Sequence, residues 1–228
     1  MYWQEDDQRR EFRVPDDIQD LAFRINCPRL PLEHAEALSA ALQQALPWLA
    51  EEPCAGIHLI HGAESGNGWM RPEDPATEVL HLPRRARMTL RLPKERLEEA
   101  HALTGKTLDV GGYRLEVGEA LVKPLSVAPT LFARYVVDLD DAGEEAFVEV
   151  VAAEIRALGI KVRKLMCGRV HRLGTAAGAV VTRSIMVADL DKRDSVLLQQ
   201  RGIGPHRQQG CGLFLPHKSI APVVDADR

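Results

Sequence analysis

The amino-acid sequence predicts an α+β fold made of two tandem ferredoxin-like units, each with the element order βαββαβ, and a glycine-rich loop near the C-terminus. Three observations support this prediction. Hydrophobic periodicity marks six strands and helices in each half of the chain. Equivalent elements of the two halves recur at a lag of roughly 100 residues. Four glycines between residues 202 and 212 precede the last predicted strand.

The first half begins with a strand and a well-marked helix. Apolar residues alternate over 21–27, as in a strand, until Pro28 and Pro31 interrupt the pattern. Between Ala35 and Leu49, apolar residues recur at steps of three and four, so one face of a helix can pack on a sheet. The remaining elements predicted for this half are strands at 56–61, 87–92 and 113–117 and a short helix at 94–103.

The second half repeats this order. It contains a predicted strand at 131–138, a helix that Gly159 ends, strands at 162–172 and 180–188, a short helix at 192–200 with Asp191 as its N-cap, and a last strand at 212–215. We therefore expect an acidic N-terminal arm at 1–17 and ferredoxin-like domains at 18–122 and 126–220.

Composition excludes several classes of protein. With 45% hydrophobic and 27% charged residues, the chain is not a disordered polymer. No segment approaches the ~18 apolar residues of a membrane helix, and the first residues do not resemble a signal peptide. We therefore expect a cytoplasmic protein with no membrane partner. Cys27, Cys54, Cys167 and Cys211 lie too far apart to predict a zinc site or a disulfide framework.

Positive charge is concentrated in the second half, although the formal net charge is −4. Residues 1–20 carry seven Asp and Glu against three Arg, which accounts for the whole net charge. Residues 160–220 carry eleven Lys and Arg against three Asp. A solvated surface is one interpretation of such a region, and a binding site for a phosphate-bearing partner is the other.

The glycine-rich loop favours the second interpretation. It runs from Gly202 to Gly212, includes Gly204 and Gly210, and has a cationic centre at His206 and Arg207. Glycines let a backbone curve into a run of N–H donors that a phosphate can approach. Because the loop follows the C-terminus of a predicted helix, whose dipole repels anions, we expect Arg207 and His206 to supply the attraction.

The chain resembles the CRISPR-associated repeat-RNA-processing endoribonucleases, the Cas-six family of the RAMP superfamily. The resemblance rests on the duplicated order of RRM-like units, on the glycine spacing Gly202-x-Gly204-x5-Gly210-x-Gly212, and on the segments 61–69 and 210–218. It implies recognition of the repeat in precursor CRISPR RNA, a stem-loop among the expected forms, and a single cut that uses no metal or other cofactor. It also implies possible partnership with other Cas proteins in an effector complex.

Two other functions stay open at this point. A subunit of the same fold could hold guide RNA without cutting it. A small-molecule enzyme or regulator could use the glycine loop for a metabolite phosphate, although the positive charge of the second half is large for one small ligand.

Metal-independent RNA cleavage requires a base for the 2′-hydroxyl, an acid or cation for the departing 5′-oxygen, and a donor for the crowded phosphate. Histidine suits the first role because its ordinary pKa lies near 6.5. His61 is our first candidate, because it opens a loop that also contains the hydroxyl of Ser65. His34, at the start of the first helix, is the rival. Lys218, near the end of the last strand, is the candidate cation.

The resemblance makes the second unit the RNA-binding domain. Five basic residues fall on its predicted strands, and we expect them to line a groove for the repeat stem: Arg163, Lys164, Arg169, Arg172 and Arg183. Aromatic residues form only 5% of the chain, so few rings are available to stack on unpaired bases. Recognition of the shape of a duplex is therefore favoured.

Overall fold

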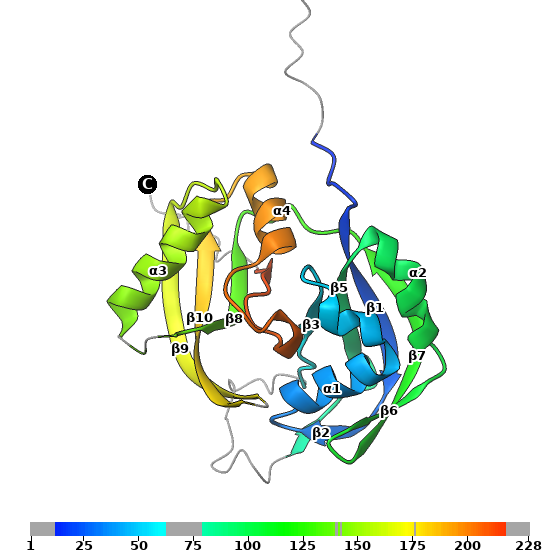
Figure 1. Ribbon diagram of the computed structural model, residues 1–228. Coiled ribbons are helices and arrows are strands. Elements are labelled where there is room, and N and C mark those ends of the chain that lie inside the picture. Colours follow the sequence, from blue (N-terminus) through cyan, green and yellow to red (C-terminus); the bar gives the residue numbers. More distant parts are fainter. Residues whose placement is uncertain (1–11, 63–78, 140, 142, 176, 218–228) are drawn as a thin grey trace, which may run out of the picture.

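The computed structural model describes residues 12–62, 79–139, 141, 143–175 and 177–217, and it shows two α+β units side by side (Figure 1). We call residues 18–123 the first half and residues 131–216 the second half.

The first half forms a five-stranded antiparallel sheet with the order β3-β5-β1-β7-β6. Its elements are β1 (Ile18–Asn26), α1 (Ala35–Ala45), β3 (Gly56–His58), β5 (Arg87–Pro93), α2 (Leu97–Ala100), β6 (Thr107–Val110) and β7 (Tyr113–Lys123), with 3-10 turns at Pro47–Glu51, Lys94–Arg96 and His101–Leu103. A separate small sheet pairs β2 (Arg29–Pro31) with β4 (Val79–His81). Without the hairpin strand β6, the order of the main sheet is that of a ferredoxin-like unit.

The second half repeats this arrangement in a four-stranded antiparallel sheet with the order β11-β8-β10-β9. Its elements are β8 (Leu131–Val137), α3 (Glu144–Ala157), β9 (Lys164–Thr175), β10 (Gly178–Ala188), α4 (Lys192–Arg201), a 3-10 turn at Arg207–Gln209 and β11 (Leu215–Pro216). Asp191 caps α4 as predicted, because its side chain accepts the N–H of Asp194 at 2.8 Å. The predicted tandem ferredoxin-like fold is confirmed.

Some element boundaries differ from the prediction for identifiable reasons. The first helix ends at Ala45, and Pro47 then begins a 3-10 turn. The strand expected at 56–61 ends at His58. The last strand starts at Leu215 and not at Gly212, whose φ of +66° lies outside the β region. The domain boundaries at 122 and 126 stay predictions.

Each half has its own hydrophobic core between its sheet and helices. A smaller cluster joins the halves, with Ala35 and Leu59 from the first and Leu173 and Cys211 from the second. The glycine-rich segment lies between the two sheets, close to α1 and β3 (Figure 1). Among the described residues, no helix is both long and apolar enough to cross a membrane.

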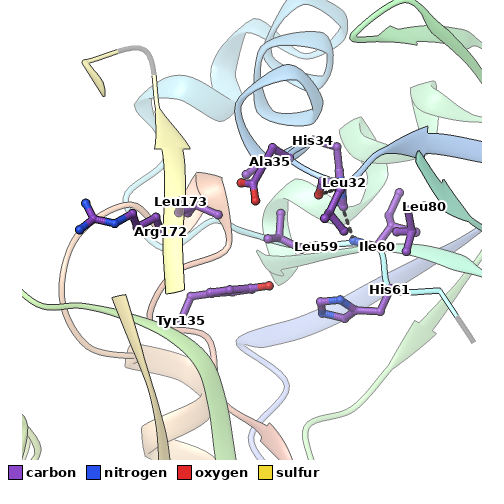
Figure 2. A pocket seen from close by; sticks show the side chains of 11 residues that line it. Leu32, His34, Ala35, Leu59, Ile60, His61, Leu80, Tyr135, Arg172 and Leu173 are labelled. Carbon is purple, nitrogen blue, oxygen red and sulfur yellow. Dashed lines mark hydrogen bonds between the residues drawn. The ribbon is translucent and has the colours of Figure 1, made fainter. Parts of the chain in front are cut away.

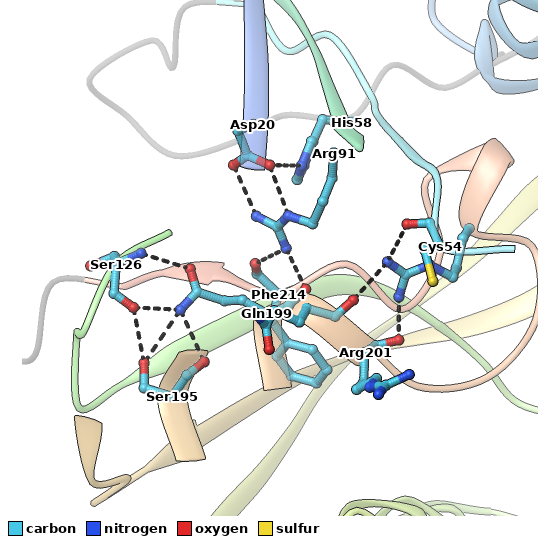
Figure 3. A network of polar contacts seen from close by, with 11 residues as sticks. Asp20, Cys54, His58, Arg91, Ser126, Ser195, Gln199, Arg201 and Phe214 are labelled. Atoms are coloured by element: carbon cyan, nitrogen blue, oxygen red, sulfur yellow. Dashed lines mark hydrogen bonds and ion pairs between the residues drawn. The ribbon is translucent and has the colours of Figure 1, made fainter. Parts of the chain in front are cut away.

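A buried ion pair also connects the halves (Figure 3). Arg91 is fully buried on β5, and its guanidinium binds both carboxylate oxygens of Asp20 at 2.8 and 3.0 Å. The same guanidinium donates to the carbonyl oxygens of Gln199 at 3.0 Å and Phe214 at 2.9 Å, both in the second half. Burial alone would raise the pKa of Asp20, but His58 and Arg91 outweigh it and hold that pKa well below 3.8.

Candidate active site

A pocket lies beyond the end of β3, and both halves contribute to its wall (Figure 2). From the first half come residues of the turn before α1 and of the segment after β3, including His34, Ile60 and His61. From the second half come Tyr135 of β8 and Arg172 and Leu173 of β9. The pocket exists only because the two units pack together.

His61 projects into this pocket towards Tyr135 (Figure 2). The residue as a whole is exposed to solvent. The pocket wall still removes part of the water from around the imidazole, and the positive charge of Arg134 lies close by, so the pKa of His61 is lowered from its ordinary 6.5. At neutral pH the ring is therefore uncharged and can accept a proton.

His34 is the N-cap residue of α1, and its side chain is buried. Its Nδ1 lies 3.0 Å from the carbonyl oxygen of Pro31 and 3.2 Å from that of Leu32, so this nitrogen carries the proton. Its Nε2 accepts the backbone N–H of Ile60 at 3.1 Å. Burial lowers the pKa of His34. Both ring nitrogens are thus bound to backbone groups, and Nε2 holds the amide of Ile60, which directly precedes His61.

Three residues of the second half at this site were missed by the sequence analysis. Tyr135 directs its hydroxyl towards His61 (Figure 2), the ring of His171 packs edge-on against Tyr135 at 5.4 Å, and Arg134 influences the pKa of His61. A bulge in β8 lets two consecutive polar side chains approach the site, because Ala133 and Val136 are paired with β10 residues only two apart. Two adjacent polar residues inside an otherwise apolar strand were the available signal.

The glycine-rich loop does not present the expected concave run of free N–H donors, and that prediction is wrong. The N–H of Gly204 donates to the carboxylate of Glu154 at 3.0 Å, and that of Gly212 donates to the carbonyl oxygen of Tyr135 at 2.7 Å. The N–H of Gly210 is bound within the turn. These donors are satisfied by the second half itself. The loop reaches the first half through the side-chain amide of Gln208, which donates to the carbonyl oxygen of Leu49 at 2.6 Å.

Arg207 is turned inward, contrary to our expectation that it faces a phosphate. Its guanidinium donates to the carbonyl oxygens of Gln200 and Arg201 at the end of α4 and to that of Cys54 in the first half. This cation therefore complements the helix C-terminus directly. Burial lowers its pKa to about 10. His206 has a left-handed backbone (φ +63°), and its carbonyl oxygen accepts two N–H groups of the same turn.

The basic residues of the second half do not share one groove. Arg183 binds Asp138 at 2.7 Å and lies over the ring of Phe147, so it is engaged on the helix side of the sheet. Arg163 donates to the carbonyl oxygen of Asp189, and Lys164 pairs with its carboxylate at 3.0 Å.

The other two arginines lie on β9 and are exposed. Arg172 borders the pocket and directs its guanidinium away from it (Figure 2). Arg169 lies at a second bulge, between Cys167 and Val170. Of the five basic residues, Arg169 and Arg172 therefore remain the strongest candidates for phosphate contacts.

Comparison with known proteins identifies the family. A family model described as Cas6 Crispr matches residues 19–219, which is most of the chain. The chain belongs to the Cas6 family. The CRISPR-associated endonuclease Cas6 of Myxococcus xanthus (strain DK1622) is 32% identical over 204 residues, which cover 90% of this chain and 84% of the relative.

Solved structures of other Cas6 and RAMP proteins share the fold. A CRISPR-associated protein Cas6 aligns with a TM-score of 0.60 at 14% identity and covers 88% of this chain and 100% of its own. A Cas6-related protein from Pyrococcus furiosus gives 0.61 at 12% identity, with 87% and 98% covered. A RAMP protein that binds different RNA substrates gives 0.58 at 11% identity, with 86% and 98% covered.

Two candidates of the sequence analysis, Ser65 and Lys218, lie outside the described residues of this Cas6 protein. Among the described residues, no group of three or more His, Cys, Asp and Glu side chains is arranged to hold a metal ion.

Proposed function

We propose that this Cas6 protein is an endoribonuclease that binds the repeat of precursor CRISPR RNA and cuts it, without a metal ion, to release guide RNA. The ribose 2′-hydroxyl attacks the adjacent phosphate and displaces the 5′-oxygen of the next nucleotide. The products then carry a 2′,3′-cyclic phosphate and a 5′-hydroxyl. The name of the relative from Myxococcus xanthus supports the endonuclease activity, and the pocket supports the mechanism.

His61 is the general base in this proposal. Its lowered pKa keeps the imidazole uncharged at neutral pH, as the removal of a hydroxyl proton requires. General base catalysis of this kind contributes ~10²–10⁴ in rate. His34 acts through the backbone, because its bond to the N–H of Ile60 fixes the residue that precedes His61.

The second half supplies the groups that stabilise the transition state. The guanidinium of Arg134 can neutralise the phosphate as it gains negative charge. The hydroxyl of Tyr135 can donate to the departing 5′-oxygen or to a phosphate oxygen. Arg169 and Arg172 bind neighbouring phosphates. From the sequence alone, we also propose that the hydroxyl of Ser65 belongs to the catalytic site and that Lys218 is a cation that binds phosphate.

The observation that carries the proposal is the position of His61, which faces Tyr135 in a pocket built by both halves. The test is His61→Ala with the cognate repeat RNA in excess EDTA. We expect cleavage to slow by ~10² or more. Because a base acts on the transition state, RNA affinity should stay within roughly threefold of wild type.

A matched control is His101→Ala, because His101 is exposed in a 3-10 turn of the first half. Normal cleavage by His61→Ala would remove His61 as the base. If the wild-type protein bound the repeat and never cut it, the function would instead be that of a guide-RNA-binding subunit.

The remaining predictions concern where the protein acts and what it binds. We expect the protein to act in the cytoplasm, to recognise a repeat with a stem-loop, and to associate with other Cas proteins after cleavage. Residues 126–220 are the proposed RNA-binding domain.

A further inference from the structure

An apolar row crosses all four strands of the second-half sheet. Phe132 of β8 lies directly opposite Leu215 of β11 and Met186 of β10, and Met186 lies opposite Met166 of β9. Directly opposed residues of antiparallel strands project from the same face of a sheet. We call these four side chains the apolar row.

The apolar row lies on the face of the sheet that the helices do not cover. Residues adjacent to the row along the strands, Leu131, Ala133, Ile185 and Val187, are buried in the core that contains residues of α3. In contrast, Met166 is 59% exposed and Leu215 is 40% exposed, and Phe132 and Met186 are half-buried. Beside the row, the ring of His217 packs against Phe132 with the ring centres 5.8 Å apart.

The charge around the apolar row is entirely positive within the sheet. None of the residues in the described strands β8, β9, β10 and β11 is Asp or Glu. Arg134 and Lys164 each lie two positions from a member of the row, and alternation therefore places them on the same face. Lys164 also pairs with Asp189, which follows β10. An apolar surface bordered by cations, on a sheet without carboxylates, fits a polyanion that carries flat apolar rings.

We propose that the apolar row is a platform on which unpaired bases of the bound RNA stack. Sheets of this strand order can bind single-stranded RNA when ring side chains occupy their open face. Phe132 and Met186 lie on β8 and β10, the two central strands of this sheet. The polarisable thioethers of Met166 and Met186 extend the surface that Phe132 begins, because methionine sulfur packs favourably on aromatic rings.

The position of the platform connects it to the candidate active site. Tyr135 lies three residues from Phe132 on the same strand, which corresponds to about 10 Å along β8. Nucleotides stacked on the row would therefore lie close to the phosphate that is cut. This inference rests on the proposed function, because it takes the RNA substrate as the ligand.

The test compares two RNA probes against three variants. The probes are a fluorescently labelled short oligouridylate and an abasic oligonucleotide of the same length, with affinity measured by fluorescence anisotropy. Phe132→Leu keeps an apolar side chain but removes the ring, and Met166→Ala removes an exposed thioether. Val170→Ala is the matched control, because Val170 is 50% exposed on the same strand but lies opposite Arg183, whose guanidinium packs over Phe147 on the helix side.

We expect Phe132→Leu to weaken binding of the oligouridylate by roughly five- to hundredfold. Met166→Ala should weaken it by roughly two- to tenfold. Binding of the abasic probe should not change, because the phosphates and their cations are unaltered, and Val170→Ala should bind both probes as wild type does. Thermal unfolding checks whether Phe132→Leu is folded. Met166→Ala tests the platform independently, because the Met166 side chain is exposed and its loss should not disturb the core.

Two results would overturn the platform. One is an unchanged affinity of Phe132→Leu and Met166→Ala for the oligouridylate. The other is an equal loss with the abasic probe, which would show a role in phosphate binding or in folding alone. A parallel assay of repeat-RNA cleavage by the wild-type protein separates failure of the platform from failure of the proposed function. An active wild-type enzyme with unaffected platform variants would contradict only the platform.

Discussion

Replacing His34 should weaken the fold and slow RNA cleavage together, because this buried ring connects the start of α1 to the segment after β3 that leads into His61. Its Nδ1 donates to the carbonyl oxygen of Pro31 at 3.0 Å, and its Nε2 accepts the N–H of Ile60 at 3.1 Å. His34→Ala removes both bonds. The amide of Ile60, one residue before His61, is then left buried without this partner.

The expected loss of stability follows from these contacts. An unpaired buried N–H costs about 1–3 kcal/mol, and each lost hydrogen bond contributes about 1 kcal/mol. The cavity left by the ring adds a further term, so His34→Ala should lower the free energy of unfolding by about 3–5 kcal/mol. For a chain of this size, such a loss lowers the melting temperature by about 10 °C.

A glutamine at this position distinguishes a scaffold from a catalyst. The side-chain carbonyl of His34→Gln can accept the N–H of Ile60, but an amide cannot act as a general base near neutral pH. We expect His34→Gln to recover part of both the stability and the cleavage rate that His34→Ala loses. Thermal unfolding and single-turnover cleavage, measured well below the melting temperature, provide the two readouts. A stable but inactive His34→Gln would refute the reasoning and make His34 the proton acceptor.

Three further predictions follow from local geometry. Gly210→Ala should destabilise the protein by about 2–3 kcal/mol in urea unfolding, because φ is +88° and a Cβ would lie 2.7 Å from the side chain of Leu59. Gly105→Ala is the control: φ is +82° but no atom lies within 4 Å of the added Cβ, so its cost should be only about 1 kcal/mol. Equal costs for the two variants would contradict the close contact at Gly210. The lowered pKa of Asp20 means that its ion pair stabilises the fold above pH 3.8 and loses this effect as the pH falls towards the folded-state pKa. Asp20→Asn should therefore be less stable than wild type at neutral pH by about 3 kcal/mol, because Arg91 loses its charged partner. The free energy of unfolding of this variant should also fall less steeply in acid than that of the wild type. Parallel curves of unfolding free energy against pH for the two proteins would argue against this role of Asp20. Because the pKa of His61 is lowered, the cleavage rate should stay constant as the pH falls through 6.5 and decline only in more acid solution, whereas an inflection at or above 6.5 would contradict this environment.

The tandem fold could be predicted from sequence because local patterns encode it. The helical periodicity of α1 and α3, the cap at Asp191 and the stop at Gly159 each depend on residues close together in the chain. The strand order then follows from the duplicated βαββαβ arrangement. Composition and spacing were sufficient for these features.

The details of the site could not be predicted, because they depend on contacts between distant residues. Gly204 looked free to bind a phosphate, but its N–H is bound by Glu154, fifty residues earlier. Arg207 looked exposed, but the packing of the halves turns it towards Cys54. His61 was chosen as a candidate from its polar loop. Tyr135 faces it in the pocket but was missed, because two adjacent polar residues in an apolar strand do not by themselves show that the strand lies opposite His61.

The 2′-hydroxyl mechanism is tested most directly by a repeat RNA that carries a single 2′-deoxy nucleotide immediately 5′ of the scissile phosphate, incubated with the wild-type protein in excess EDTA. We predict that the unmodified RNA is cut to products with 2′,3′-cyclic phosphate and 5′-hydroxyl ends, and that the deoxy RNA binds but is not cut, because the nucleophile is absent. Cleavage of the deoxy RNA, or a strict requirement for magnesium, would contradict the mechanism.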